Sequence, residues 1–193
     1  MKAVMMSIQP KWCELIASGK KTVEVRKTRP KLEAPFKVYI YCTTTGDLCY
    51  KSNNDGKVRI TKNTLSRVKS LSNTHQKFCN GKVIGEFVCD TYIVDKTFGY
   101  DPLMYAAACM SEADVAWYCT NKEMYGWHIS DLVIYDEPKE LSSFYRPCLY
   151  EDNDDISCFL CDKLGRRPDD ANLDCFYFCE KPPQSWYYVE ELR

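Results

Sequence analysis

Residues 9–26, QPKWCELIASGKKTVEVR, join a helix pattern to a strand pattern without a linker. Trp12, Leu15 and Ile16 are apolar at positions i, i+3 and i+4, which is the spacing of one helix face. Pro10 suits the first turn of a helix, and Gly19 suits the left-handed residue that follows the last turn. The pattern predicts a short helix over residues 9–18 that ends sharply at the glycine.

The strand pattern runs from Thr22 to Arg26. Val23 and Val25 alternate with polar residues, which predicts a half-buried strand. The charged side chains of Lys21, Glu24 and Arg26 would then converge where the helix end meets the strand. Lysine and arginine there could bind an anion or the polar edge of a base, while the glutamate orients the ligand or exchanges a proton. The alternative is an exposed ladder of salt bridges.

Strand patterns outnumber helix patterns in the rest of the chain. Residues 36–43, 82–94, 126–135 and 182–189 are rich in β-branched and aromatic residues, and residues 111–119 have a helix start signal. Strands and helices do not alternate, so the pattern argues against a parallel α/β sheet. We expect an α+β fold: a small, mostly antiparallel β-barrel with short helices at its mouth and a cysteine-rich tail.

The charge is distributed unevenly. The formal net charge is -1, yet residues 1–82 hold 17 Lys and Arg against 5 Asp and Glu, and the rest of the chain is acidic. A loop-like insertion over residues 44–82 carries seven basic residues and no acid after Gly56. Basic segments gathered on one face would attract a polyanion. The alternative is that the basic and acidic halves pair with each other.

The pattern Gly19-x-Lys21-Thr22-x-Glu24-x-Arg26, preceded by residues 7–10, resembles the ASCH domain of the PUA-like superfamily. Residues 127–145 and the terminal Pro-Pro-Gln-Ser-Trp resemble bacterial members of that family. The resemblance implies a PUA-like barrel over residues 1–147, a cysteine-rich part over 148–181 and a returning strand over 182–193. It also implies a cleft that recognises RNA or a modified nucleotide, for which the candidate ligand-binding residues are Lys20, Lys21, Thr22, Glu24, Arg26, Trp12 and Trp127.

One branch of this family consists of amidohydrolases that release acetate from acetylcytidine, and there the lysine that matches Lys21 is catalytic. An alternative function is therefore hydrolysis of an acylated nucleobase, with Lys21 as nucleophile or base and Glu24 as proton carrier. That branch has threonine where this chain has Glu24, and its catalytic acid has no counterpart that we could match. A hydroxyl and a carboxylate cannot play the same role.

The twelve cysteines fall into two groups. Seven lack the spacing of metal ligands, and we expect them to be packing residues: Cys13, Cys42, Cys49, Cys79, Cys89, Cys109 and Cys119. In the tail, the pattern Cys158-x2-Cys161-x13-Cys175-x3-Cys179 could hold a tetrahedral zinc ion, with Cys148 as a substitute ligand, or these cysteines could simply pack. No cofactor is otherwise required.

The sequence contains no apolar run near the roughly 20 residues that span a bilayer, and residues 1–7 do not read as a signal peptide. We therefore expect a cytoplasmic protein whose partner is RNA, a nucleoside or a nucleotide, with no membrane contact. The oligomeric state does not follow from the sequence.

Overall fold

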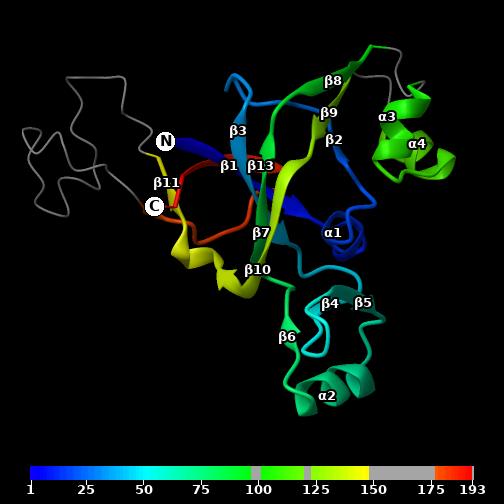
Figure 1. Ribbon diagram of the computed structural model, residues 1–193, viewed down its shortest axis with the longest axis vertical. Coiled ribbons are helices and arrows are strands. Elements are labelled where there is room, and N and C mark those ends of the chain that lie inside the picture. Colours follow the sequence, from blue (N-terminus) through cyan, green and yellow to red (C-terminus); the bar gives the residue numbers. More distant parts are fainter. Residues whose placement is uncertain (97–100, 120–122, 148–176, 193) are drawn as a thin grey trace, which may run out of the picture.

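A computed structural model describes residues 1–96, 101–119, 123–147 and 177–192 (Figure 1). The fold is mixed α+β, with many strands and a few short helices, as the sequence predicts. None of the described helices is long and apolar enough to cross a membrane.

The largest sheet has five strands and contains the centre of the core. Its order is β10 (Ser130–Glu140), β7 (Lys82–Cys89), β3 (Phe36–Cys42), β1 (Lys2–Ile8) and β13 (Trp186–Glu190). The apolar strand β3 lies in the middle, as its composition predicts. Among the described strand pairs, β1 and β3 are parallel and the others are antiparallel.

A second sheet has the order β2 (Val23–Arg26), β9 (Met124–His128) and β8 (Tyr92–Asp95). The sequence predicted single strands over 82–94 and 126–135, but each of these segments is divided between the two sheets. The break between β7 and β8 lies at residues 90–91, and the break between β9 and β10 at residue 129. The described sheets remain separate and none closes on itself, so the expected barrel is not confirmed.

Gly85 shows why β7 is irregular. Ile40 of β3 pairs with Gly85 and Tyr41 pairs with Val83, so the pairing passes over Ile84 of β7. A side chain on Gly85 would lie 2.3 Å from the backbone oxygen of Val133 in β10. Only glycine allows the two backbones to approach so closely. The bend expected from this glycine is therefore present.

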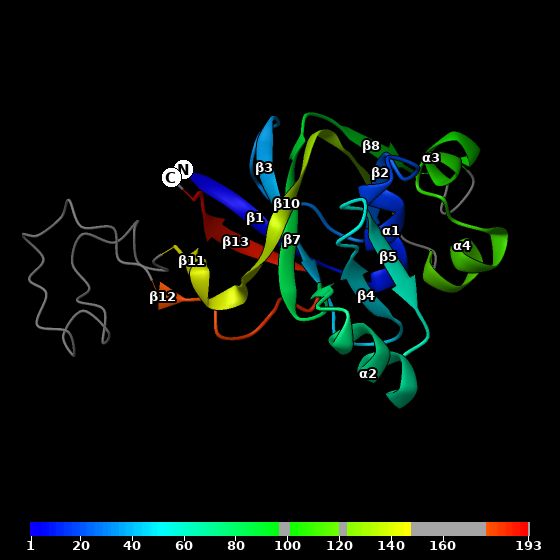
Figure 2. The ribbon, with the colours of Figure 1, turned by 60° about the horizontal axis from the view of Figure 1, so that its bottom comes forward.

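Three helices lie on the same side of the molecule as the second sheet (Figures 1 and 2). They are α1 (Pro10–Ala17), α3 (Pro102–Ala107) and α4 (Glu112–Tyr118). Helix α1 ends as predicted, at Gly19 with φ +72°. Helix α4 begins with the predicted cap, in which Ser111 and Asp114 bond each other's backbone N–H groups. Helix α3, which packs on β2, was not predicted.

Residues 44–82 form a lobe that projects from the body of the molecule (Figure 1), and we call it the basic lobe. It contains β4 (Leu48–Lys51), β5 (Val58–Thr61) and β6 (Lys77–Phe78), with the order β5-β4-β6, and the helix α2 (Leu65–Asn73). Strands β4 and β5 form a hairpin within the segment that was expected to be loop-like, and α2 was not predicted.

The chain near its C-terminal end has little regular structure among the described residues. A 3-10 helix, Leu141–Ser143, takes the place of the one or two helical turns predicted over 138–144, because β10 continues to Glu140. The short strands β11 (Tyr145–Arg146) and β12 (Tyr177–Phe178) pair with each other. The terminal strand β13 pairs with β1, as expected of a strand that returns to the domain.

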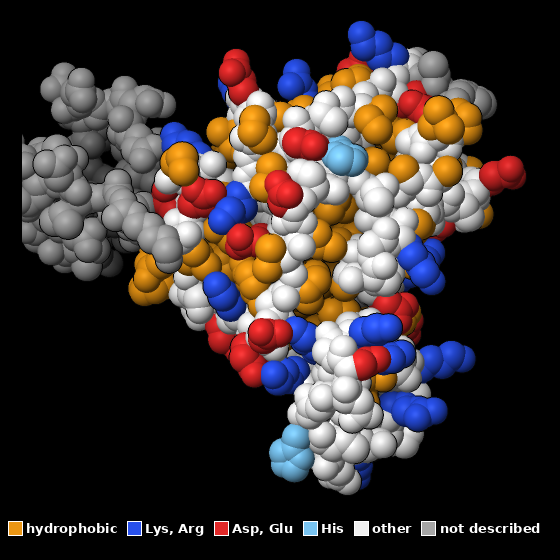
Figure 3. Space-filling view, viewed as in Figure 1, with side chains coloured by type: hydrophobic (Ala, Val, Ile, Leu, Met, Phe, Trp, Pro, Cys, Tyr) orange, Lys and Arg blue, Asp and Glu red, His pale blue; other side chains and the backbone are white. Residues whose placement is uncertain are grey.

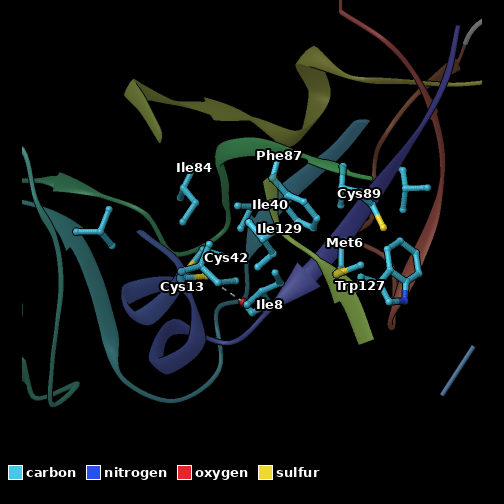
Figure 4. Packing of buried hydrophobic residues seen from close by; sticks show 14 of the residues in the cluster. Met6, Ile8, Cys13, Ile40, Cys42, Ile84, Phe87, Cys89, Trp127 and Ile129 are labelled. Carbon is cyan, nitrogen blue, oxygen red and sulfur yellow. Dashed lines mark hydrogen bonds between the residues drawn. The ribbon is translucent and has the colours of Figure 1, made fainter. Parts of the chain in front are cut away.

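Six of the seven cysteines predicted to pack are buried, and Cys109 is half-buried. Figure 4 shows Cys13 and Cys42 side by side in the core. The thiols of Cys13, Cys42 and Cys79 donate to the carbonyl oxygens of Ile8, Thr43 and Lys77. Burial raises the pKa of Cys13, and neighbouring thiols together with burial raise the pKa of Cys42, Cys49 and Cys79. These thiols are therefore protonated packing residues at neutral pH.

Candidate functional site

A cleft of about 200 Å³ opens where α1, β2 and α4 meet. The end of β1 and the start of α1 form one side, β2 with Lys21 two residues before it forms the floor, and the α3–α4 segment forms the opposite side. In that order, the lining residues are Ser7, Ile8, Gln9, Lys11 and Trp12; Lys21, Glu24, Val25 and Arg26; and Met110, Asp114, Trp117 and Tyr118. We call this the cleft.

The cleft floor holds three charged side chains that are almost fully buried. The exposed fractions of Lys21, Glu24 and Arg26 are 3%, 6% and 8%. Glu24 lies between the two cations: its Oε2 is 3.3 Å from Lys21 Nζ, and its Oε1 is 2.9 Å from Arg26 Nη2. The prediction that these side chains converge is confirmed, whereas the alternative of an exposed ladder is wrong.

Strand β2 is buried on both faces, so the predicted half-buried strand is also wrong. Its apolar side chains, Val23 and Val25, belong to a core cluster that contains Met104 and Tyr105 of α3. Helix α3 therefore covers the apolar face that was expected to be buried. The opposite face, with Glu24 and Arg26, was expected to be exposed but is buried at the floor of the cleft.

Further hydrogen bonds fix the two cations in place. Lys21 Nζ donates to the carbonyl oxygen of Ala108 at 2.7 Å. Arg26 Nη2 donates to the carbonyl oxygen of Ser7 at 2.6 Å, and Arg26 Nη1 donates to Ser185 Oγ at 3.4 Å. The floor is therefore rigid, because each cation joins β2 to a segment distant in sequence.

Two polar atoms of the floor lack a hydrogen-bond partner among the described residues: Glu24 Oε2 and Arg26 Nε. Both are buried, and buried polar atoms are nearly always bonded in folded proteins. The floor thus retains an acceptor and a donor for a ligand or for water.

The side of the cleft formed by α1 is aromatic and cationic. The ammonium groups of Lys11 and Lys21 lie 4.2 and 4.8 Å from the centre of the Trp12 ring. Lys11 also lies 3.7 Å from Asp114 of α4, which links the two sides of the cleft. Trp12 lines the cleft as predicted, but its ring already contacts two cations.

The opposite side is formed by residues that the sequence analysis did not select. Trp117, Tyr118 and Asp114 lie on α4, and Met110 precedes it. Hydrogen bonds from Ser111 hold the pKa of Asp114 below its usual range, and burial raises the pKa of Tyr118 although Arg26 opposes this. The capping signal at Ser111 predicted helix α4, but it did not indicate against which part of the protein this helix lies.

Three of the predicted ligand-binding residues lie outside the cleft. Lys20 and Thr22 are exposed and do not line it. Trp127 is fully buried, and its ring packs against Phe36 and Tyr92. In this structure Trp127 is a core residue, and it has no surface on which a base could stack.

The predicted zinc ligands cannot be assembled from the structure. Cys158, Cys161 and Cys175 lie outside the described residues, as does Cys148. Cys179 is 1% exposed, and its backbone N–H donates to the carbonyl oxygen of Phe144. Over the described part of the chain, no group of three or more Cys, His, Asp or Glu side chains is arranged to hold a metal ion. Zinc in the tail stays a prediction.

This geometry defines a class of protein: a small α+β domain with an open cleft over a buried, charged floor. The family model of the ASCH domain matches residues 6–129, so the chain belongs to the ASCH domain family. This match includes β2 and both sides of the cleft.

A solved structure of similar fold is ASCH from Zymomonas mobilis, with a TM-score of 0.50 and 17% identity over 98% of this chain and 88% of that one. One mutant of the same protein has a TM-score of 0.48 and 18% identity over 99% of this chain and 92% of its own. A second mutant has a TM-score of 0.46 and 16% identity over 98% of this chain and 89% of its own. At these identities the likeness shows the fold alone. No curated protein gives a significant match.

Proposed function

We propose that this chain is a binding module for RNA or a modified nucleotide. The cleft receives the ligand, and the basic lobe holds phosphates. The observation that carries the proposal is the cleft floor, where Lys21, Glu24 and Arg26 are buried together beside an open cavity. Burying charges is costly, and three of them at the base of a cleft favour a role in recognition.

The basic lobe supports the second part of the proposal. Lys57, Lys62, Arg67 and Lys69 are exposed, and Figure 3 shows Lys and Arg side chains along this lobe. Exposed cations close together attract phosphates through long-range electrostatics.

Other lysines of the lobe have a different role. Lys51, Lys77 and Lys82 lie 3.1, 2.5 and 2.8 Å from Asp136, Glu137 and Glu140 of β10. The alternative that the basic and acidic halves pair with each other is thus correct for these residues. They join the lobe to the main sheet, and the exposed cations of the lobe are the candidates for phosphate contacts.

The test is fluorescence anisotropy with a labelled short single-stranded RNA at increasing salt concentration. We expect tight binding at low salt and a linear fall of log affinity with log salt, with a slope of about -0.7 for each phosphate neutralised. The double variant Lys62→Gln with Lys69→Gln should weaken binding and flatten the slope.

The matched control is Lys31→Gln with Lys181→Gln, which removes the same charge from exposed positions near β13. It should leave the slope nearly unchanged. The proposal is wrong if the chain binds no RNA or nucleotide at low salt, and phosphate binding by the lobe is wrong if both double variants behave alike.

A second candidate is hydrolysis of an acylated nucleobase such as acetylcytidine. The observation that favours it is the distance of 3.3 Å between Lys21 Nζ and Glu24 Oε2, over which the carboxylate could take a proton from the amine. Chromatography of acetylcytidine incubated with the chain should then show cytidine, and Glu24→Gln should abolish its release. Intact substrate, under conditions where a known acetylcytidine hydrolase is active, would exclude this function.

A further inference from the structure

We infer that the cleft takes one unpaired base, which stacks on Trp117 while its polar edge bonds to Glu24 and Arg26. This inference rests on the proposed function, since it names the part of an RNA or nucleotide that the cleft recognises. Three independent features of the cleft support it: an exposed aromatic side chain, a small volume and two buried polar atoms in the floor that make no hydrogen bond, one of which is the Glu24 oxygen that faces the Lys21 ammonium.

The first feature is Trp117. It lines the cleft, yet 80% of its surface is exposed. An indole ring that borders a cleft and remains open to solvent is free to contact a ligand that enters the cleft. Trp12 contacts two ammonium groups. Trp117 is therefore the better platform for a base, and stacking on an aromatic ring does not depend on which base is present.

The position of Trp117 is fixed by its helix. Ser111 and Asp114 cap α4, and Lys11 of α1 lies 3.7 Å from the same carboxylate. A platform held by a capped helix loses little freedom when a ligand binds.

The second feature is size. The cavity volume of about 200 Å³ is below the roughly 300 Å³ at which pockets for drug-sized ligands begin. It suits a single ring system and is too small for a base pair. Because bases within a duplex are stacked and paired, only an unpaired nucleotide can place its base there.

The third feature is the pair of unbonded atoms in the floor. Glu24 Oε2 is an acceptor and Arg26 Nε is a donor, and neither has a hydrogen-bond partner among the described residues. Every nucleobase carries both N–H donors and lone-pair acceptors on its edges. A base that stacks on Trp117 and points an edge toward β2 would supply the missing partners.

The experiment compares a labelled short single-stranded RNA with a blunt-ended duplex of the same strand and its complement, in which every base is paired, both by anisotropy at constant salt. We expect the single strand to bind more tightly. Trp117→Ala should weaken its binding by about 5- to 150-fold, the range that base–aromatic stacking supplies, and Trp117→Phe should restore most of the loss. Exposed side chains on short helices are replaced without loss of the fold, and urea unfolding of each variant verifies this.

The matched control is Leu103→Ala. Leu103 is 82% exposed on α3 and does not line the cleft, so its truncation should leave affinity unchanged. Competition with uridine monophosphate distinguishes the two sources of the base. If the free nucleotide displaces the RNA from the wild type but not from Trp117→Ala, the platform recognises the base by itself.

The outcomes separate this inference from the proposed function. If the wild type binds the single strand and Trp117→Ala binds it equally well, or if the blunt-ended duplex binds as tightly, the inference is wrong while RNA binding stands. If the wild type binds neither RNA nor nucleotide at low salt, both are wrong.

Discussion

The cleft floor and the basic lobe contain the same kinds of charged residue in opposite environments. Lys21 and Arg26 are buried around Glu24, whereas Lys62 and Lys69 are exposed on the lobe. Buried charges are held at fixed distances and interact strongly, while exposed charges act over longer range and are screened by salt. Under the proposed function, the floor would confer selectivity and the lobe a general attraction to phosphates.

The largest expected effect is on the floor. Glu24→Ala leaves two cations buried without their shared anion, so the free energy of unfolding should fall by about 3 to 5 kcal/mol. The exposed double variant Lys62→Gln with Lys69→Gln should change it by no more than about 0.5 kcal/mol per site. Urea denaturation measures both. Equal effects would remove the distinction between the two regions.

The next effect concerns the helices that border the two regions. Ser111 caps α4 at the cleft, and Thr64 caps α2 in the lobe. Ser111→Ala should destabilise α4 by about 0.5 to 2 kcal/mol and speed amide hydrogen exchange there, because the helix loses its capping acceptor.

Thr64→Ala is the matched control for that prediction. It should speed exchange in α2 alone and leave the affinity for uridine, which has no phosphate for the lobe to hold, nearly unchanged, whereas Ser111→Ala should weaken uridine binding by loosening the helix that carries Trp117. Equal losses of affinity in the two variants would show that α4 has no special part in the cleft.

The smallest effect is a dependence on pH. The pKa of Asp114 is lowered by its hydrogen bonds to Ser111, so its carboxylate stabilises the fold above the unfolded pKa near about 3.9. That contribution is lost as the pH falls through the lower, folded value. The stability difference between wild type and Asp114→Asn should therefore shrink in acid. A difference that is constant from neutral pH to acid would contradict the role of this carboxylate as a cap.

The local pattern of residues 9–26 was sufficient to predict α1, its end at Gly19 and the strand that carries the charged cluster. Propensity also placed β3 at the centre of the main sheet. The pattern could not show that β2 is buried on both faces, because the covering residues come from α3 and α4, far along the chain. The same lack of tertiary information explains why Trp117 was not selected as a site residue. The start of its helix could be predicted at Ser111, but no local signal indicates which side of a short helix borders a cleft.

The prediction of single strands over 82–94 and 126–135 was wrong for a related reason. Residues 82–94 are rich in strand-forming residues on both sides of Asp90, and a single Asp did not indicate that the chain passes from one sheet to the other at residues 90–91. Trp127 looked like a candidate for stacking because aromatic residues serve both cores and binding sites. Its complete burial follows from packing against Phe36 and Tyr92, which is a tertiary property.

The four tryptophans allow the most direct test of the central claim, that a ligand occupies the cleft. Trp12 and Trp117 line it, while Trp127 and Trp186 do not. In an NMR titration with unlabelled single-stranded RNA, the indole N–H signals of Trp12 and Trp117 should shift, and those of Trp127 and Trp186 should move little. If the RNA shifts signals of the basic lobe to saturation while the Trp12 and Trp117 indoles stay in place, the cleft is not the binding site.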